Sequence, residues 1–235
     1  MMLTFFMRHK LTGTCLGDLL ALISNICPLD NQCIKTLHKF KKDLSMIGNN
    51  FVVCHYFCAN CEDPLPNEAA CEHCAQGTKV NYFLEIPLLN QLQSLFLRPG
   101  FYDSLLFRFQ RAKKFRENLE DIYDAEVYQA EMQNGFLNER NNISFMWYTD
   151  GIAIFKSSNF SIWPMYLVIN ELSYKMRTQR QNIIVAGVWF GDKKPNPNIF
   201  LSPLHSELQR FQADGHLFEL PDREPVLVKA KLLCL

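Results

Sequence analysis

Two closely spaced cysteine doublets restrict the fold of this chain more than any other part of its sequence. Cys58 and Cys61 are separated by two residues, as are Cys71 and Cys74, and nine residues lie between the doublets. Each doublet can bend around one metal ion, so that four thiolates form the tetrahedron that Zn²⁺ takes in structural sites. We therefore predict a structural Zn²⁺ ion bound by Cys58, Cys61, Cys71 and Cys74.

A redox pair or unbound thiols are the competing interpretation of these cysteines. Two doublets so close together favour metal, and we expect no secretory signal, which makes disulfides a poor explanation of the nine cysteines. Three neighbours, Cys54, His55 and His73, could each replace one ligand, and the spacing leaves this open. Four protein ligands close a zinc site, so its role should be structural rather than catalytic.

Composition excludes several classes of protein. The chain has 24 basic and 24 acidic residues and no net charge, which argues against a strongly electrostatic nucleic-acid binder. The longest apolar run, Ile183 to Gly191, is too short to cross a bilayer. We expect a soluble intracellular protein with no membrane partner and a substantial hydrophobic core.

Residues 1–50 have the periodicity of helices. One apolar stripe with a possible cap at Thr12 or Thr14 is formed by Leu16, Leu19, Leu20, Ile23 and Ile26. A second stripe follows over Asn31 to Leu44, and the lysines of this segment lie largely away from it: Lys35, Lys39, Lys41 and Lys42. Residues 51–80, rich in turn formers, would be a zinc-binding module.

Residues 81–134 are predicted to be a helical connector. After a break at Arg98 to Gly100, a longer helix is expected with a stripe of Leu105, Phe109, Ala112, Phe115 and Leu119. Basic residues crowd this segment: Arg108, Arg111, Lys113, Lys114 and Arg116. They could contact phosphates, but an ordinary solvated helix face is the favoured interpretation.

Residues 135–235 change to a strand pattern. We predict strands at Ile143 to Thr149, Ile152 to Phe155, Ile162 to Ile169, Ile183 to Phe190 and Pro225 to Leu235. Asp150-Gly151 predicts a hairpin between the first two strands, and Pro164 predicts an edge strand or a bulge. A helix over Phe200 to Phe211 precedes the last strand, with Pro203 in its first turn. The predicted fold class is α+β.

Asp150 has two interpretations. A carboxylate at the end of a central strand is a common position for a metal ligand in two-metal phosphoryl transfer. From spacing alone, however, Asp150-Gly151 is better explained as a turn.

The order of short motifs resembles that of CACTA-type (En/Spm-like) DNA transposases in the form found in animal genomes. Those motifs are Asp150-Gly151, Lys156-Ser157-Ser158, Trp163-Pro164, Gly187 to Gly191, Lys194-Pro195 and Phe200 to Leu208. Upstream, HKLTGTCLGDLLALI is similar to the leading helix of that family, and HYFCANC with CEHC to its cysteine module. An acidic-aromatic block matches at Asp121 to Asp124, although Ala125 stands where the family has glycine.

The resemblance implies an incomplete RNase H-like nucleotidyl transferase domain in residues 135–235. It implies Mg²⁺-dependent DNA strand cleavage and transfer, with Asp150 as the first metal-binding carboxylate. The second carboxylate would follow the strand at 226–235, and the third would lie on a later helix. Other acidic residues match neither position and should lie on the surface: Asp192, Glu207, Asp214 and Asp222.

One carboxylate does not hold two metal ions, so we expect these 235 residues to be catalytically incomplete. The resemblance implies DNA, another copy or a full-length transposase as partner, a nuclear location and no small-molecule substrate. The alternative is a non-enzymatic, zinc-dependent DNA- or protein-binding adaptor recruited from a transposon.

Overall fold

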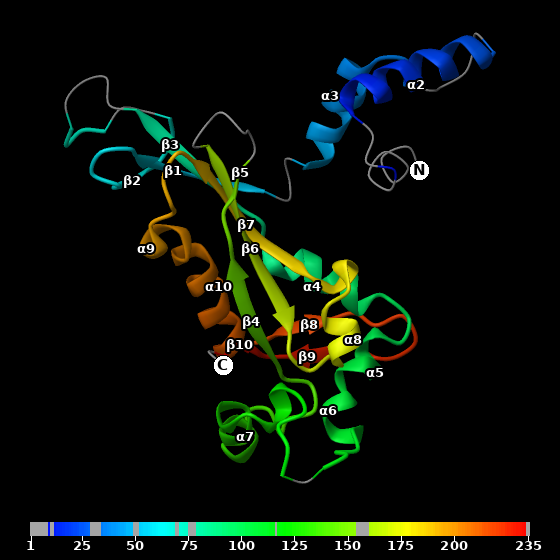
Figure 1. Cartoon of the computed structure of the whole chain (residues 1–235), viewed down its shortest axis with the longest axis vertical. Coiled ribbons are helices and arrows are strands. Elements are labelled where there is room, and N and C mark those ends of the chain that lie inside the picture. The colour runs from blue at the N-terminus through cyan, green and yellow to red at the C-terminus, as the bar shows by residue number, and fades with distance from the viewer. Residues whose placement is uncertain are drawn as a thin grey trace. The chain divides into compact units, whose positions relative to one another are not determined.

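The computed structural model of the chain is shown in Figure 1. It describes residues 9, 12–28, 34–48, 52–68, 71–74, 79–115, 117–153 and 160–233. The chain divides into two compact units, Met1–Val52 and Val53–Leu235, which are described separately.

The N-terminal unit is a pair of helices, α2 (Gly13–Ile26) and α3 (Leu37–Gly48). Thr12 caps α2, because its Oγ1 accepts a hydrogen bond from the backbone N–H of Cys15 at 3.2 Å. A small apolar cluster joins the helices through Leu16, Leu20 and Phe40, with Ile34 and Leu37 against it. Both predicted helices are present, but α3 begins at Leu37, and the first part of its predicted range, residues 31–33, lies outside the described residues.

The larger unit is built on a mixed, mostly antiparallel sheet of eight strands (Figure 1). The strands are β1 (Val53–Cys58), β2 (Pro64–Leu65), β3 (Val80–Glu85), β4 (Ile143–Thr149), β5 (Ile152–Ala153), β6 (Ser161–Ile169), β7 (Ile184–Gly191) and β10 (Ala230–Leu232). Their order is β10-β4-β6-β7-β3-β1-β2, and β5 pairs with β6. This arrangement confirms the α+β class at the level of a mixed sheet with helices.

Strand β10 is parallel to β4, whereas the remaining pairs are antiparallel. The register pairs Ala230 with Ile143 and Leu232 with Phe145. Between β7 and β10 the chain passes through α9 (Pro197–Phe200) and α10 (Ser202–Ala213), with Pro203 in the first turn of α10 as predicted. A separate two-stranded sheet, β8 (His216–Phe218) with β9 (Val226–Val228), lies between α10 and β10 in the sequence.

The predicted hairpin at Asp150-Gly151 is wrong. Strand β4 pairs with β6 from Phe145 to Thr149, and Ile152 and Ala153 pair with Ile162 and Ser161 instead of with β4. The physical reason is the register: Thr149 pairs with Met165 and Ile152 with Ile162, so β4 and β5 follow β6 in one direction and the chain does not reverse at Gly151. The close packing of Gly151 on Trp163, where an added Cβ would lie 2.5 Å from the ring, belongs to this extended path. Pro164 lies in a central strand rather than at an edge, and the predicted irregularity occurs beside it, between Met165 and Tyr166.

The predicted helical connector is also partly wrong. It contains strand β3 before α4 (Leu88–Phe96), and α5 (Phe101–Leu105) and α6 (Phe107–Gln110) replace the single long helix. The helix stops at Gln110 because the Glu120 carboxylate accepts the backbone N–H groups of Lys114 and Phe115 at 2.9 and 2.8 Å. These N–H groups are therefore bound outside a helix. The segment then continues through η1 (Ile122–Asp124) and α7 (Glu126–Gln133).

The predicted last strand, Pro225 to Leu235, is two strands. Val226–Val228 pairs with β8, a strand that the pattern did not predict, and Ala230–Leu232 pairs with β4. Residues 234 and 235 lie outside the described residues.

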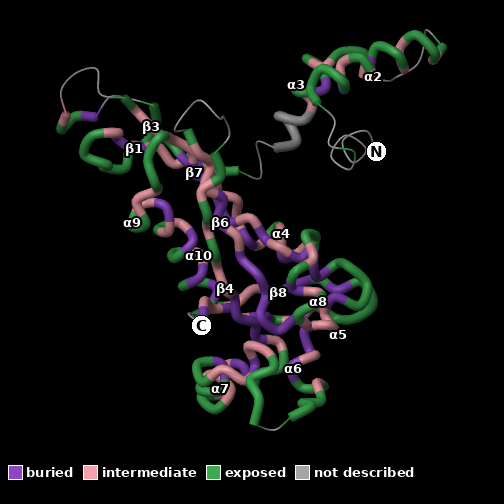
Figure 2. Tube along the Cα trace, viewed as in Figure 1, coloured by how far each residue is buried: buried purple, intermediate pink, exposed green. Residues whose placement is uncertain are grey.

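The main core lies between the sheet and one layer of helices, α4, α9 and α10. Side chains that alternate toward this layer include Phe83, Phe145, Leu167 and Trp189, and the helices contribute Leu92, Phe96, Phe200, Leu204 and Leu208. Figure 2 shows buried stretches along β4, β6 and α10. Short helices α8 (Tyr174–Arg177) and η2 (Arg180–Asn182) join β6 to β7.

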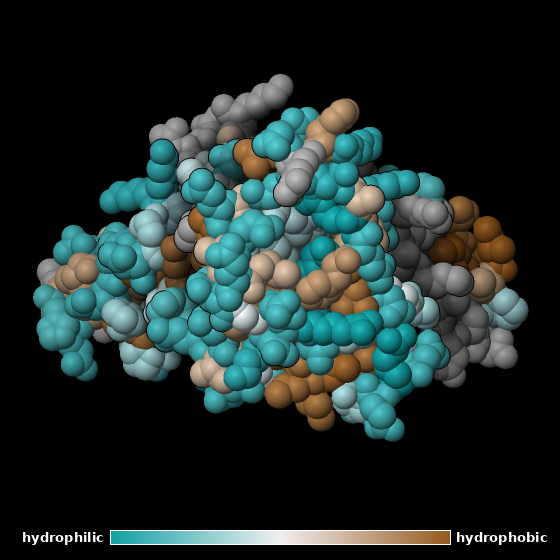
Figure 3. Space-filling view, turned by 90° about the horizontal axis from the view of Figure 1, so that it is seen from below, coloured by the Kyte–Doolittle hydropathy of each residue, from teal (hydrophilic) through white to brown (hydrophobic). Residues whose placement is uncertain are grey.

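The face seen in Figure 3 is mostly hydrophilic, with apolar patches between the polar residues. Among the described residues, no helix combines the length and apolar character needed to cross a membrane.

Candidate metal centre

Four cysteine sulfur atoms converge at the end of β1. Their Sγ atoms all lie within 4.8 Å of one another, with 3.7 Å between Cys58 and Cys74 and 3.5 Å between Cys61 and Cys71. A tetrahedral zinc site with Zn–S bonds of about 2.3 Å places its sulfurs about 3.8 Å apart. The donor set and its spacing therefore fit a Zn²⁺ ion with little rearrangement.

The backbone after β1 is folded to present these sulfurs. Cys58 donates its N–H to the Asp63 carbonyl at 3.0 Å and accepts the Glu62 N–H on its own carbonyl at 3.0 Å. Glu62 has a φ of 63°, the left-handed conformation that reverses the chain. Asn60 donates its backbone N–H to the Cys58 sulfur at 3.4 Å and its side-chain amide to the Cys74 sulfur at 3.5 Å. Such N–H groups stabilise thiolates.

The thiols differ in acidity when no metal is bound. Hydrogen bonds from the backbone N–H groups of Cys61 and Asn60 lower the pKa of the Cys58 thiol to about 6. A backbone N–H of Asp63 lowers the pKa of the Cys61 thiol, but the Asp63 carboxylate, burial and the neighbouring thiols together raise it above its usual value. The Cys58 thiolate thus forms readily, whereas the Cys61 thiol would need a bound cation to compensate the charge of its thiolate.

The neighbouring candidates do not join the cluster. Within the described part of the chain, the group that could hold a metal ion comprises the four cysteines of the two doublets. His55 is turned to Glu85, with its Nε2 atom 2.6 Å from Oε2, and its ring stacks on Phe83. Cys54 and His73 are exposed.

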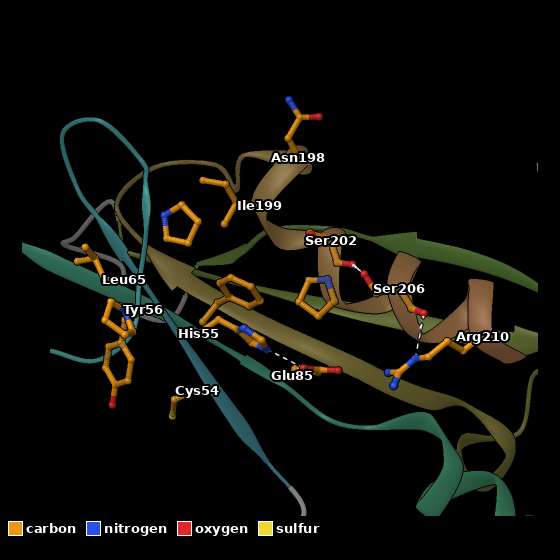
Figure 4. Close-up of a pocket in the computed structure, with 14 residues that line it drawn as sticks. Cys54, His55, Tyr56, Leu65, Glu85, Asn198, Ile199, Ser202, Ser206 and Arg210 are labelled. Carbon is orange, nitrogen blue, oxygen red and sulfur yellow. Dashed lines mark hydrogen bonds and ion pairs between the residues drawn. The ribbon is translucent and has the colours of Figure 1, made fainter. Parts of the chain in front are cut away.

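The His55–Glu85 pair lies in a groove of about 590 Å³ between β1, β2 and the helices α9 and α10 (Figure 4). Ser202, Ser206 and Arg210 line its helical side. The Ser206 hydroxyl donates to the Ser202 carbonyl at 3.0 Å, and Arg210 Nε donates to the Ser206 carbonyl. These polar groups are thus engaged along the helix rather than directed at His55, as Figure 4 shows.

The metal centre is continuous with the main sheet. Strand β1 pairs with β3 from Val53 to Cys58, and β3 pairs with β7. Phe57, next to Cys58 of the cluster, stacks on Trp189 of β7 with 4.6 Å between ring centroids. Consequently the position of the first cysteine is coupled to the core by both hydrogen bonds and aromatic packing.

Asp150 lies apart from the metal centre, at the carboxyl end of β4. It is exposed, and its Oδ1 accepts the Gly151 N–H at 2.8 Å. In the described residues Asp150 belongs to no group of three or more His, Cys, Asp or Glu side chains that could hold a metal ion. The Lys156-Ser157-Ser158 motif lies outside the described residues.

The basic cluster predicted on a helix is largely neutralised. Arg108 is buried and lies 3.6 Å from the Glu171 carboxylate, while Arg111 and Lys113 contact Asp124 at 2.8 and 3.5 Å. Arg116 lies outside the described residues. Asp121 of the acidic-aromatic block forms an ion pair with Arg177 at 2.9 Å. The acidic residues of this block therefore stabilise the fold by neutralising nearby cations.

Sequence patterns missed two structural carboxylates. Glu171 is fully buried and accepts hydrogen bonds from the Ser144 N–H and hydroxyl at 2.7 and 2.8 Å and from the Tyr128 hydroxyl at 3.1 Å. Glu207, predicted to be a surface residue, accepts the Leu88 N–H at 3.0 Å and caps α4. Burial raises the pKa of both carboxyl groups. Neither residue had a neighbouring motif that would have revealed its partner.

No protein-family model matches this chain, and no curated protein matches its sequence.

Proposed function

We propose that this chain is a transposase-derived, zinc-stabilised DNA-binding protein that carries one carboxylate of an RNase H-like metal site. The ancestral activity is Mg²⁺-dependent strand cleavage and transfer, and Asp150 is the residue that would hold Mg²⁺. The proposal takes its family from the order of motifs in the sequence.

The observation that carries the proposal is the parallel pairing of β10 with β4. The resemblance places the first carboxylate after β4 and the second after the strand that contains β10. Leu232 lies opposite Phe145, and because the two strands are parallel, a continuation of this register would lead toward Asp150 at the same edge of the sheet. The Leu233 N–H bonds to the Phe145 carbonyl at 2.8 Å, so this pairing extends beyond the end of β10.

Asp150 by itself is insufficient for two-metal catalysis. Two Mg²⁺ ions need several carboxylates to stabilise both the attacking and the leaving oxygen. No such cluster surrounds Asp150 in the described residues. We therefore propose that residues 1–235 bind DNA without cleaving it, and that cleavage requires carboxylates from elsewhere.

A non-enzymatic adaptor is the second candidate. It is favoured by the same isolation of Asp150, whose Oδ1 accepts the Gly151 N–H, and by a cysteine cluster that offers four protein ligands to a metal ion. In this case Zn²⁺ would hold the β1–β3 edge in shape for a partner, and Asp150 would have no affinity for Mg²⁺.

Metal binding at Asp150 separates the two candidates. Because the Trp163 ring packs on Gly151, its indole NMR signal should broaden when Mn²⁺ binds beside Asp150. The transposase-derived proposal predicts selective broadening of that signal, abolished by Asp150→Asn but retained in Asp192→Asn, which changes another exposed aspartate. Equal broadening in Asp150→Asn would remove the metal role. Fluorescence anisotropy with a labelled DNA duplex tests DNA binding, and no binding at low salt would refute this part of the proposal.

A further inference from the structure

Charge is divided unequally between the two units of this neutral chain. Residues 1–52 contain six Lys or Arg and three Asp or Glu, a net charge of +3. The remaining residues contain 18 and 21, a net charge of −3. A polyanion would therefore be attracted to the N-terminal unit and repelled by the larger one.

Three of the six basic residues of the N-terminal unit, Lys39, Lys41 and Lys42, lie on α3, and Lys35 lies just before it. Leu37 and Phe40 face α2, and Phe40 is buried in the cluster that joins the helices. Positions three and four residues apart share a helix face, so Lys39 and Lys42 lie away from this contact, and Lys41 lies at its border beside Leu37. All of them are exposed: Lys35, Lys39, Lys41 and Lys42.

These lysines contrast with the cations of the larger unit. In the ranges that the structure describes, no carboxylate forms an ion pair with Lys35, Lys39 or Lys41. The larger unit instead places several cations against carboxylates, including Arg111, Arg177, Arg223 and Lys231. Within those ranges, Lys35, Lys39 and Lys41 thus keep their charge available for an external anion.

The zinc-binding module is a poor alternative for contact with phosphate. Residues 51–80 contain one lysine, Lys79, and four carboxylates, Glu62, Asp63, Glu68 and Glu72. A Zn²⁺ ion with four thiolates would add two further negative charges. DNA should therefore avoid this module.

We propose that the exposed lysine face of α3 binds the phosphate backbone of double-stranded DNA. This inference rests on the proposed function, because it locates the DNA contact of that function. An α-helix of about 10–12 Å diameter fits the DNA major groove, which is about 12 Å wide. Lysines on its outer face then reach phosphates, and the buried Phe40 side keeps α3 attached to α2.

The test compares two triple variants of the full, zinc-loaded chain that remove the same charge. The first is Lys35→Gln, Lys39→Gln and Lys41→Gln, and the control is Lys79→Gln, Lys114→Gln and Lys175→Gln in the larger unit. Glutamine and lysine have similar helix propensity, and circular dichroism with thermal melting checks that both variants remain folded. Anisotropy with a fluorescein-labelled 20-bp duplex is measured at several NaCl concentrations.

Each phosphate contact contributes about −0.9 to the slope of log K against log salt. The α3 variant should therefore lose about 2–3 from the slope, and its affinity at low salt should fall by at least tenfold. The control variant should retain most of the wild-type salt slope and most of the wild-type affinity at low salt.

Equal losses in the two variants would overturn the inference, because they would indicate a general charge effect. Wild-type binding by the α3 variant would refute the inference and leave the proposed function standing, whereas no duplex binding by the wild-type chain would refute both. Vesicles containing 30% phosphatidylserine are a separate arm. Lysine-dependent binding to vesicles without duplex binding would make α3 a membrane-surface helix and also overturn the inference.

Discussion

Replacing Cys71 with serine tests whether the four-cysteine cluster stabilises the larger unit. Cys71 is buried, and its sulfur lies 3.5 Å from that of Cys61, close to the separation of about 3.8 Å in a zinc tetrahedron. The site is thus nearly formed before metal binds, and most of the binding free energy should appear as stability. Free Zn²⁺ at 1,000 times its Kd stabilises a folded protein by about 4.1 kcal/mol.

For a unit of this size, about 1 kcal/mol corresponds to a change in Tm of roughly 2–4 °C. Zinc should therefore raise the Tm of the wild-type chain by roughly 8–16 °C, and most of this increase should be absent in Cys71→Ser. Trp189 fluorescence is a suitable probe, because Trp189 stacks on Phe57 beside Cys58 of the cluster. Bound zinc is counted in parallel by mass spectrometry, with an expected value of about one per chain.

Cys54→Ser is the matched control, since Cys54 is exposed and lies outside the cluster. This variant should bind zinc and melt like the wild type. The reasoning would be refuted if Cys71→Ser kept its zinc and the full zinc-dependent increase in Tm.

Three further predictions concern the larger unit. Glu171→Ala should destabilise it by about 3–5 kcal/mol in urea denaturation, because Arg108 would remain buried without its carboxylate, and Glu224→Ala, an exposed control, should change little. A loss as small as that of the control would contradict this view. Burial acts to raise the pKa of Asp124, but hydrogen bonds from Arg111 and from backbone N–H groups lower it to about 2. A depressed pKa contributes stability that is complete above about pH 4 and lost as the pH falls through about 2. Asp124→Asn should therefore flatten the acid limb of the stability profile, and an unchanged limb would refute the assignment. Gly151→Ala should destabilise the unit and alter the environment of Trp163, because the new Cβ would overlap the Trp163 ring, and an unchanged tryptophan spectrum and Tm would count against this packing.

Local sequence signals predicted the elements whose pattern is self-contained. Ile143 to Thr149 is the strand β4 with the predicted bounds, and the Thr12 cap, the helix after Pro203 and the cysteine cluster are all present. Each of these features depends on residues that are close together in the sequence, so the local sequence pattern is sufficient to predict it.

Elements fixed by distant partners were not predictable in this way. The apolar spacing predicted a helix that continues past Gln110. The residues near Gln110 do not reveal that the Glu120 carboxylate accepts the backbone N–H groups of Lys114 and Phe115. Likewise, the apolar run at 225–235 divides between two different partner strands. The contact of His55 with Glu85 depends on the pairing of β1 with β3, which the turn-rich composition of residues 51–80 concealed.

The pairing of β3 with β7 also determines which shortened forms of this protein can keep a complete sheet. A shortened or spliced form that begins after residue 86 would discard β1, β2 and β3 and leave the inner strand β7 as an open edge. Gly187, Val188 and Trp189 would then lose their partners in β3, and the unpaired backbone groups make such an edge prone to association with other chains. The cysteine module is consequently not a detachable accessory, and any truncation meant to isolate the Asp150 region should begin at Val53 or earlier.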